Sequence, residues 1–211
     1  MKTDELIGLL AQDAPVRDKL LGRLLLAFLL GMAVATGLFA ARVGIRPDVL
    51  SAGQTVRFLF KVLLVFALFC ISAAAVSQVG RPEARLAPWG IAFAALTIAL
   101  GIAVAAELFV TPESLWGVRL VGQNAVFCLV VIPTLAVAPL AFLLFALRGG
   151  APARPGLAGA IAGLAASGMA ATLYAIHCPD DSPLFVATWY SIATALVTGV
   201  GYVAGSRLLR W

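Results

Sequence analysis

Hydrophobic residues in this chain are gathered into six long runs, and polar residues are largely confined to the segments between them. The runs lie at about Leu24 to Ala41, Val62 to Val79, Leu86 to Ala106, Ala125 to Leu147, Leu157 to Ile176 and Leu184 to Gly205. Each run has roughly the 20 residues that an α-helix needs to cross a bilayer. Every gap contains proline or glycine, which favour turns. The pattern predicts an all-α polytopic membrane protein, a bundle of six transmembrane helices.

Composition supports this prediction, because hydrophobic residues make up 62% of the 211 positions and the mean hydropathy is +1.03. One soluble domain of this length could not bury so much apolar surface. The net charge of +5 does not indicate nucleic-acid binding, since most Lys and Arg residues lie at the ends of the runs and form no basic stripe. We expect the lipid bilayer as a partner and no direct contact with nucleic acid.

Lys and Arg residues are divided unevenly between the two predicted sides of the bundle. With the N-terminus in the cytoplasm, ten of the 15 fall on the inner side and five on the outer side. Cytoplasmic loops carry such an excess of positive charge, so we predict that both termini are cytoplasmic. The predicted parts are a cytoplasmic tail over residues 1–23, the six-helix domain over 24–206 and a cytoplasmic end over 207–211.

Two of the three cysteines are predicted at the outer boundary of the bundle. Cys128 lies about one turn into the fourth run, and Cys178 follows the end of the fifth. Neighbouring antiparallel helices could bring the two within disulfide distance, and exposed thiols near charge are the reactive ones. We interpret them as a redox or sensing pair. Cys128 could instead be a small apolar residue in a helix, which is our interpretation of Cys70 in the second run.

A metal site at the same boundary is a further hypothesis. His177 and Cys178, with Cys128 and either Asp180 or Asp181, could supply ligands for a soft metal ion. The spacing matches no known metal motif, and a histidine at this place more often caps a helix C-terminus. We therefore assign no metal site and predict no cofactor.

The residues after Cys178 are typical of a helix start. Asp180, Asp181 and Ser182 precede Pro183, and acidic residues, a serine cap and an early proline all favour the first turn of a helix. We interpret them as the start of the sixth helix.

The interiors of the runs contain almost no ionisable side chains, which argues against a pump. Lys61 and Glu107 lie at helix ends, and Lys61 could extend toward polar surroundings. Gly159 and Gly163 form a small-xxx-small pair in the fifth run, which favours close helix packing. That packing could be internal or between two copies, so the oligomeric state stays open.

The N-terminal tail is predicted to form a short amphipathic helix. Thr3 can cap it, Asp4 and Glu5 fall in its first turn, and Leu6, Leu9 and Leu10 share one face. A helix this short is marginal alone and would become ordered on a partner or on the membrane surface.

Several stretches of the chain resemble one family. They are Met1-Lys2-Thr3-Asp4-Glu5-Leu6, Phe127-Cys128, HCPDDSPLFVATWY from His177 to Tyr190, and Arg207-Leu208-Leu209-Arg210-Trp211. In these residues the chain resembles the NrsF family of proteobacterial anti-sigma factors, over nearly its whole length.

The resemblance implies a six-helix inner-membrane regulator that holds an extracytoplasmic-function (ECF) sigma factor, of the sigma-F type, inactive at the membrane. It implies that the tail around Thr3 to Leu10 takes part in sigma binding. It also implies that Cys128 and Cys178 form the cysteine pair that perceives heavy-metal or oxidative stress. Cys70 is outside that pair.

A regulator of this kind would not be an enzyme. Two other classes of function are alternatives to it. A membrane thiol oxidoreductase normally needs a closely spaced pair such as C-x-x-C, and the sequence has none. A small-molecule permease would need a polar cavity between its helices.

Overall fold

The computed structural model describes residues 19–80 and 87–210, and the regular structure in these ranges is all helical. The longer helices are α2 (Lys19–Arg42), α4 (Val56–Val79), α5 (Ala87–Val110), α7 (Ala125–Leu147), α8 (Pro155–Ala175) and α10 (Ser191–Leu208). The short elements are α3 (Val49–Ala52), the 3-10 turn η1 (Glu113–Leu115), α6 (Trp116–Val121), α9 (Pro183–Phe185) and the π-helical η2 (Val186–Tyr190).

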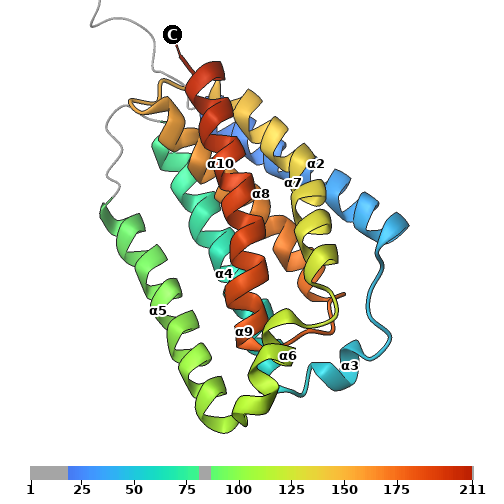
Figure 1. Ribbon diagram of the computed structural model, residues 1–211. Helices are drawn as coiled ribbons and strands as arrows, with labels where there is room; N and C mark the ends of the chain where they lie inside the picture. The colour runs from blue at the N-terminus through green and yellow to red at the C-terminus, as the bar shows by residue number, and fades with distance from the viewer. Residues whose placement is uncertain (1–18, 81–86, 211) are drawn as a thin grey trace, which may run out of the picture.

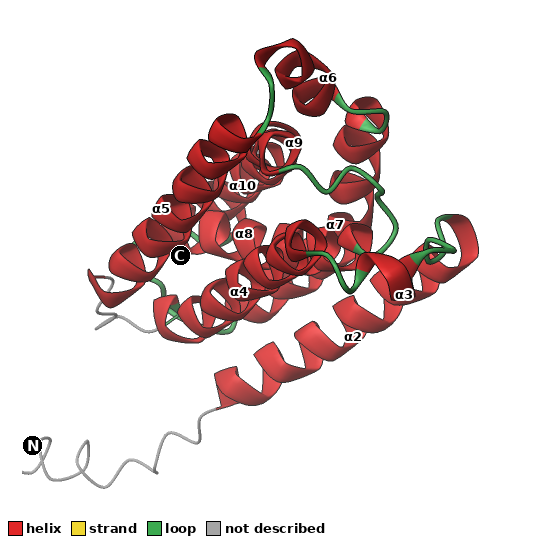
Figure 2. Cartoon of the chain, turned by 90° about the horizontal axis from the view of Figure 1, so that it is seen from below, coloured by secondary structure: helices red, strands yellow, loops and turns green. Residues whose placement is uncertain are grey.

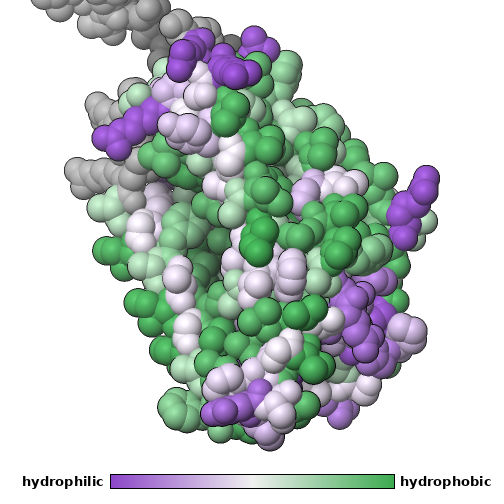
Figure 3. Space-filling model, in the orientation of Figure 1, coloured by the Kyte–Doolittle hydropathy of each residue, from purple (hydrophilic) through white to green (hydrophobic). Residues whose placement is uncertain are grey.

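Six helical stretches of the described chain are long and apolar enough to cross a membrane, which confirms the predicted number. They lie side by side in one bundle (Figure 1). Figure 3 shows hydrophobic side chains over most of one face, with hydrophilic side chains gathered mainly toward its two ends. Apolar surface of this extent fits a protein whose sides contact lipid.

Helix α8 is the centre of the bundle. It packs against α10, α4 and α7, and Figure 2 shows it among these three, with α2 and α5 farther out. Two-thirds of the α8 span is buried (67%), against 6% of the α5 span. The bundle therefore has a core around α8, and α5 is a peripheral helix that contacts α4 and the short elements α9 and η2.

Small residues allow α8 to approach its neighbours closely. A Cβ added at Gly159 would lie 2.7 Å from the Cα of Gly205 in α10, and one at Gly163 would lie 2.8 Å from the Cα of Thr198. A Cβ at Gly168 would meet the backbone of Phe69 in α4 at 2.9 Å. The small residues of the fifth run are thus used for packing within the chain.

Helix α4 begins at Val56, six residues before the start of the apolar run. The Thr55 hydroxyl caps it by accepting a hydrogen bond from the backbone N–H of Phe58 at 3.4 Å. Lys61 consequently lies inside the helix, and its side chain is 0% exposed. The polar surroundings that Lys61 reaches are groups of the protein itself, the Cys178 carbonyl and the Asp181 carboxylate, and not water.

The sixth apolar run is not one regular α-helix. Pro183–Phe185 form a single α-helical turn, Val186–Tyr190 are π-helical, and the α-helix resumes at Ser191. The indole N–H of Trp189 donates to the carbonyl of Leu120 at 2.8 Å. The π segment carries the buried Tyr190, and only the single turn of α9 separates it from the polar loop that forms the candidate site.

Candidate functional site: a buried thiol pair held by a polar loop

The candidate site is centred on residues 176–182, which connect α8 to α9 and are called the 176–182 loop. A connecting segment has no ladder of its own to satisfy its polar groups, so these groups need other partners. In this loop the partners come from α4, α5 and the connections that follow α2 and α6.

Cys178 is held through its backbone. Its carbonyl accepts a hydrogen bond from Lys61 Nζ at 2.7 Å and one from Arg46 Nη1 at 3.3 Å. Its own N–H donates to the carbonyl of Tyr174 at 3.0 Å, one turn back in α8. Two cations from distant parts of the sequence therefore fix the position of this cysteine.

The same two cations bind the carboxylate of Asp181. Lys61 Nζ lies 2.5 Å from Asp181 Oδ1, and Arg46 Nη1 lies 3.0 Å from Asp181 Oδ2. Arg46 also pairs with Asp48 at 2.7 Å, and this hydrogen bond lowers the pKa of the exposed Asp48 carboxyl below its usual range. The acidic residues that the sequence suggested as a helix start thus serve partly as counter-ions.

Asp180 caps a different helix from the one expected. Its carboxylate accepts hydrogen bonds from the backbone N–H groups of Gln123 at 3.1 Å and Asn124 at 2.9 Å, and from Asn124 Nδ2 at 2.9 Å. These groups begin α7, where a negative charge is favourable. Gly122 makes the approach possible, because its φ is +60° and a Cβ there would meet Asp180 and Phe185.

Ser182 is the N-cap that the sequence predicted for the last span. Its hydroxyl accepts from the N–H of Leu184 at 3.3 Å and lies 3.4 Å from Glu107 in α5. Glu107, which is 5% exposed, is paired with Arg57 at 2.9 Å and with Arg119. The polar groups at this end of the bundle therefore tie the peripheral α5 to α4, to α6 and to the 176–182 loop.

Cys128 and Cys178 lie at the same end of the bundle, near the start of α7 and in the 176–182 loop. Asp180 bonds to Asn124, whose carbonyl accepts from the N–H of Cys128 at 2.8 Å, so one carboxylate connects the two cysteine-bearing segments. Both residues belong to one buried core cluster. Both cysteines are free thiols and both are 0% exposed. The expectation of solvent-exposed thiols is wrong.

Aromatic side chains belong to the same buried cluster as the two cysteines. The Tyr174 ring lies 5.8 Å from that of Tyr190, 6.0 Å from that of His177 and 6.1 Å from that of Phe127, measured between centroids. The hydroxyls of Tyr174 and Tyr190 are buried, and neither has a hydrogen-bond partner among the described residues. The two thiols therefore lie in an aromatic pocket that contains polar atoms with unused hydrogen-bonding capacity.

The pocket keeps Cys178 protonated. Burial raises the pKa of the Cys178 thiol above its usual range, and the nearby Lys61 ammonium opposes this change. Because the thiolate is the nucleophile and the metal ligand, the closed pocket holds the cysteine in its less reactive form. Reaction requires the loop to open or another base to take the proton.

The larger set of metal ligands considered from the sequence does not assemble. His177 Nδ1 donates to the carbonyl of Gly44 at 3.0 Å, Asp180 caps α7, and Asp181 binds Lys61 and Arg46. In residues 19–80 and 87–210, no three His, Cys, Asp or Glu side chains are placed to hold a metal ion. The two thiols are the soft ligands that the arrangement brings together.

Other candidates from the sequence lie elsewhere. Cys70 is exposed on α4 and is not part of the pair. The proposed partner-binding residues Thr3, Asp4, Glu5, Leu6, Leu9 and Leu10 lie outside the described residues. Sequence reasoning missed that Lys61 and Arg46 hold the loop. Their positions near the ends of apolar runs indicated that they make polar contacts, but did not indicate that the partners lie in the 176–182 loop.

A cavity of about 790 Å³ adjoins the loop between α4, α5 and α6. It is lined by Arg57, Glu107 and Arg119, and by Pro179, Asp180 and Asp181 of the loop. Neither cysteine lines it, although Pro179 directly follows Cys178. The cavity therefore approaches the thiol pair without reaching it.

The described part of the chain is all helical, with six membrane-length helices and two buried cysteines, which is the build of a polytopic helical membrane protein. The sequence model of the NrsF family, described as "Negative regulator of sigma F", matches residues 9–211. The chain belongs to this family.

Two curated relatives cover 100% of this chain and of their own lengths. One, named "Anti-sigma-F factor NrsF", comes from Caulobacter vibrioides and is 35% identical over 217 aligned positions. The other, named "Probable anti-sigma-F factor NrsF", comes from Azospira oryzae and is 34% identical over 214 positions. No solved structure matches the chain.

Proposed function

We propose that this protein is an anti-sigma factor of a bacterial inner membrane, with both termini in the cytoplasm, that sequesters an ECF sigma factor of the sigma-F type. The observation that carries the proposal is the full-length match to a family of negative regulators of sigma F and to relatives named for that activity. The excess of Lys and Arg on the predicted inner side supports the orientation.

The sigma factor binds on the cytoplasmic side, where the N-terminal tail lies in this topology. In the amphipathic helix that the sequence predicts for this tail, Leu6, Leu9 and Leu10 would share an apolar face and Thr3, Asp4 and Glu5 would form the start. An amphipathic helix of this kind can dock into a groove of a partner protein. Regulation of this type needs binding and release, and no catalytic step.

The stimulus acts at Cys128 and Cys178, which the fold brings to one buried pocket. Two thiols that release their protons can hold a soft metal ion, or they can give two protons and two electrons to an oxidant and form a disulfide. Either event draws the start of α7 toward the 176–182 loop. Because α7 and α8 run through the whole bundle, a shift of their ends near the loop also moves their ends at the opposite side.

The energetic requirement is modest. A change of a few kcal/mol between two arrangements is enough to switch the population of the binding-competent state. Lys61 and Arg46 hold the carbonyl of Cys178 in the closed arrangement, so a stimulus has to overcome these charged hydrogen bonds. We propose that the closed loop corresponds to the state that retains the sigma factor.

The test of the sensing step uses Cys128→Ser and Cys178→Ser, with Cys70→Ser as the matched control, and a reporter of sigma-dependent transcription under cadmium or peroxide stress. We expect both pair variants to lose induction and the control to keep it, because Cys70 lies on α4, outside the buried pair. Full induction in both pair variants would show that the thiols are not the sensor.

The test of the binding step removes residues 2–14 and measures co-purification of the sigma factor with the membrane-embedded protein. Retention by the shortened chain, at the level of the full chain, would contradict the assignment of the tail. The binding test and the sensing test are independent, so either part of the proposal can fail alone.

A further inference from the structure

A groove at the opposite end of the bundle from the 176–182 loop combines apolar walls with a positively charged mouth. It has a volume of about 570 Å³ and runs between the start of α2 and the end of α7. Its lining residues are Arg23, Leu26, Ala27 and Leu30 of α2, Phe142, Phe145 and Ala146 of α7, and Arg148 and Gly149 directly after α7. Within residues 19–80 and 87–210, no carboxylate lines it.

The two arginines lie together at one end of the groove. Arg148 directly follows α7, Arg23 lies in the second turn of α2, and the Arg23 guanidinium rests against Gly149. Both side chains are exposed, and among the described residues neither has an ion pair or a hydrogen-bonded partner. Two planar cations with ten N–H donors in total are thus available to one anionic group.

The apolar part of the groove extends from these arginines along the helices. Leu26 is 57% exposed, Leu30 is 44% exposed and Phe145 is 74% exposed. From Arg23 to Leu30 the axis of α2 rises by about 10 Å, at ~1.5 Å per residue. This length fits the upper half of a phospholipid acyl chain, and the charged end is the end at which a headgroup would lie.

We propose that this groove binds one anionic phospholipid, whose phosphodiester is held by Arg23 and Arg148 and whose acyl chain lies along Leu26, Leu30 and Phe145. Guanidinium groups bind phosphate oxygens in two-pronged hydrogen bonds, and basic pockets between helices at the cytoplasmic side favour anionic headgroups. The site requires that the chain spans a bilayer, and it does not depend on sigma binding or on the cysteine pair.

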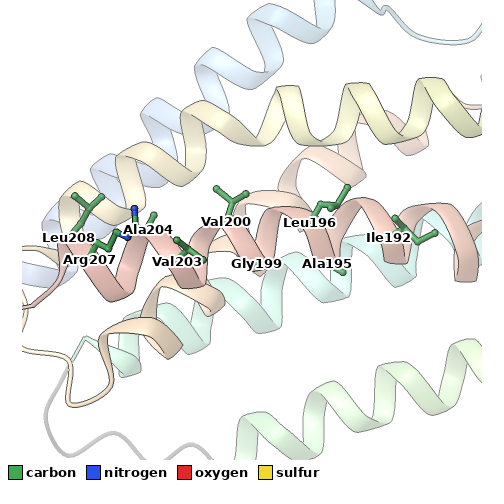
Figure 4. Close-up of a pocket in the computed structure, with 9 residues that line it drawn as sticks. All are labelled: Ile192, Ala195, Leu196, Gly199, Val200, Val203, Ala204, Arg207 and Leu208. Atoms are coloured by element: carbon green, nitrogen blue, oxygen red, sulfur yellow. The ribbon is translucent and has the colours of Figure 1, made fainter.

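Other apolar surface lacks this combination. The shallow face along α10 is lined by residues of that helix alone, including Ile192, Leu196, Val200 and Val203, with Arg207 as its one cation (Figure 4). A single helix offers lipid no second wall, and one cation gives a weaker preference for an anionic headgroup. We expect ordinary, exchangeable lipid there.

The test is native mass spectrometry of the full-length protein in a non-ionic detergent, with phosphatidylglycerol and phosphatidylcholine of identical acyl chains in competition. Wild-type protein should retain one phosphatidylglycerol. The double variant R23Q/R148Q should lower the preference for phosphatidylglycerol by roughly 30-fold, which corresponds to ~2 kcal/mol at ~1 kcal/mol per cation.

The matched control is R154Q/R210Q, which removes two exposed arginines from the same end of the bundle but from outside the groove. It should keep the wild-type preference. Equal loss in the two double variants would overturn the proposal, because it would show a general effect of net charge. Absence of any preference in the wild-type protein would overturn it as well.

A photocrosslinking residue distinguishes lipid from the protein's own N-terminal segment as the occupant. Benzoylphenylalanine is placed at Phe145 in the groove and, as a control, at Val130, which is 57% exposed on α7 and lies outside the grooves described here. We expect an adduct enriched in phosphatidylglycerol at Phe145 and adducts in proportion to bulk lipid at Val130. Crosslinking of Phe145 to residues 1–18, or the same lipid ratio at both positions, would overturn the proposal.

Discussion

Replacing Lys61 with methionine should open the 176–182 loop. The ammonium group donates to the Cys178 carbonyl at 2.7 Å and to the Asp181 carboxylate at 2.5 Å, and the side chain is fully buried. Methionine has a similar length and no charge, so Lys61→Met removes both hydrogen bonds with little change in volume. The Cys178 carbonyl and Asp181 are then left with Arg46 as their shared cation.

The free-energy cost of Lys61→Met depends on Arg46, which still binds Asp181 and the Cys178 carbonyl in the variant. Removing one member of a buried ion pair costs about 3–5 kcal/mol, and a hydrogen bond to a charged group contributes about 1.5–3 kcal/mol. Asp181 is 16% exposed in its side chain and keeps Arg46 at 3.0 Å, so the cost lies below the first range. We expect the closed loop to lose ~2–3 kcal/mol, which raises the open population roughly 30- to 150-fold.

The assay is the rate at which a maleimide reacts with Cys178 in a chain that also carries Cys70→Ser and Cys128→Ala. A buried thiol reacts from the open population, so the rate should rise by the same 30- to 150-fold. Arg57→Gln is the matched control. It removes a cation one turn earlier in α4, and that cation pairs with Glu107 rather than with the loop.

An unchanged labelling rate in Lys61→Met would refute the idea that this cation holds the loop closed. An equal increase in Arg57→Gln would show that any loss of charge at this end loosens the bundle. Size-exclusion profiles of the variants separate local opening from general unfolding. If the closed loop is the sigma-retaining state, Lys61→Met also raises sigma-dependent transcription without stress.

Three further predictions concern packing, capping and pH. Gly159→Ala should lower the free energy of unfolding by ~1–3 kcal/mol, because the added Cβ would meet the α10 backbone. Gly101→Ala is the control, since a Cβ there has no atom within 4 Å, and it should leave the melting temperature unchanged or raise it. Equal melting temperatures of the two variants would contradict the prediction. Asp180→Ala should cost ~1–2 kcal/mol through loss of the α7 cap, measured by thermal unfolding, and addition of salt should not restore it. Because burial raises the pKa of Cys178, the protonated thiol stabilises the closed loop at pH values below the unfolded pKa, and this contribution is lost as pH rises above it. The alkylation rate of Cys178 in the folded protein should therefore reach half of its maximum at a higher pH than in denatured protein, where the midpoint lies near pH ~8.5; a common midpoint would refute the effect.

The sequence by itself determined the number and the approximate limits of the long helices. Hydropathy and the spacing of prolines and glycines are local properties, and a stretch of about 20 apolar residues has few alternatives to a spanning helix. Helix α7 begins at Ala125 and ends at Leu147, where the apolar run itself begins and ends. The same local logic placed Ser182 as a cap and predicted that Cys128 and Cys178 share one end of the bundle.

Only the tertiary structure decided how that end is held together. Lys61 and Cys178 are separated by 117 positions, and Arg46 and Asp181 by 135, and nothing in either neighbourhood indicates its distant partner. The structure also decided that the thiols are buried, because the core cluster to which they belong is built from separate helices, among them α7, α8 and the π segment after α9. A charge near a helix end is compatible with water, lipid headgroup or a counter-ion, and only the packing of the helices in three dimensions selects among them.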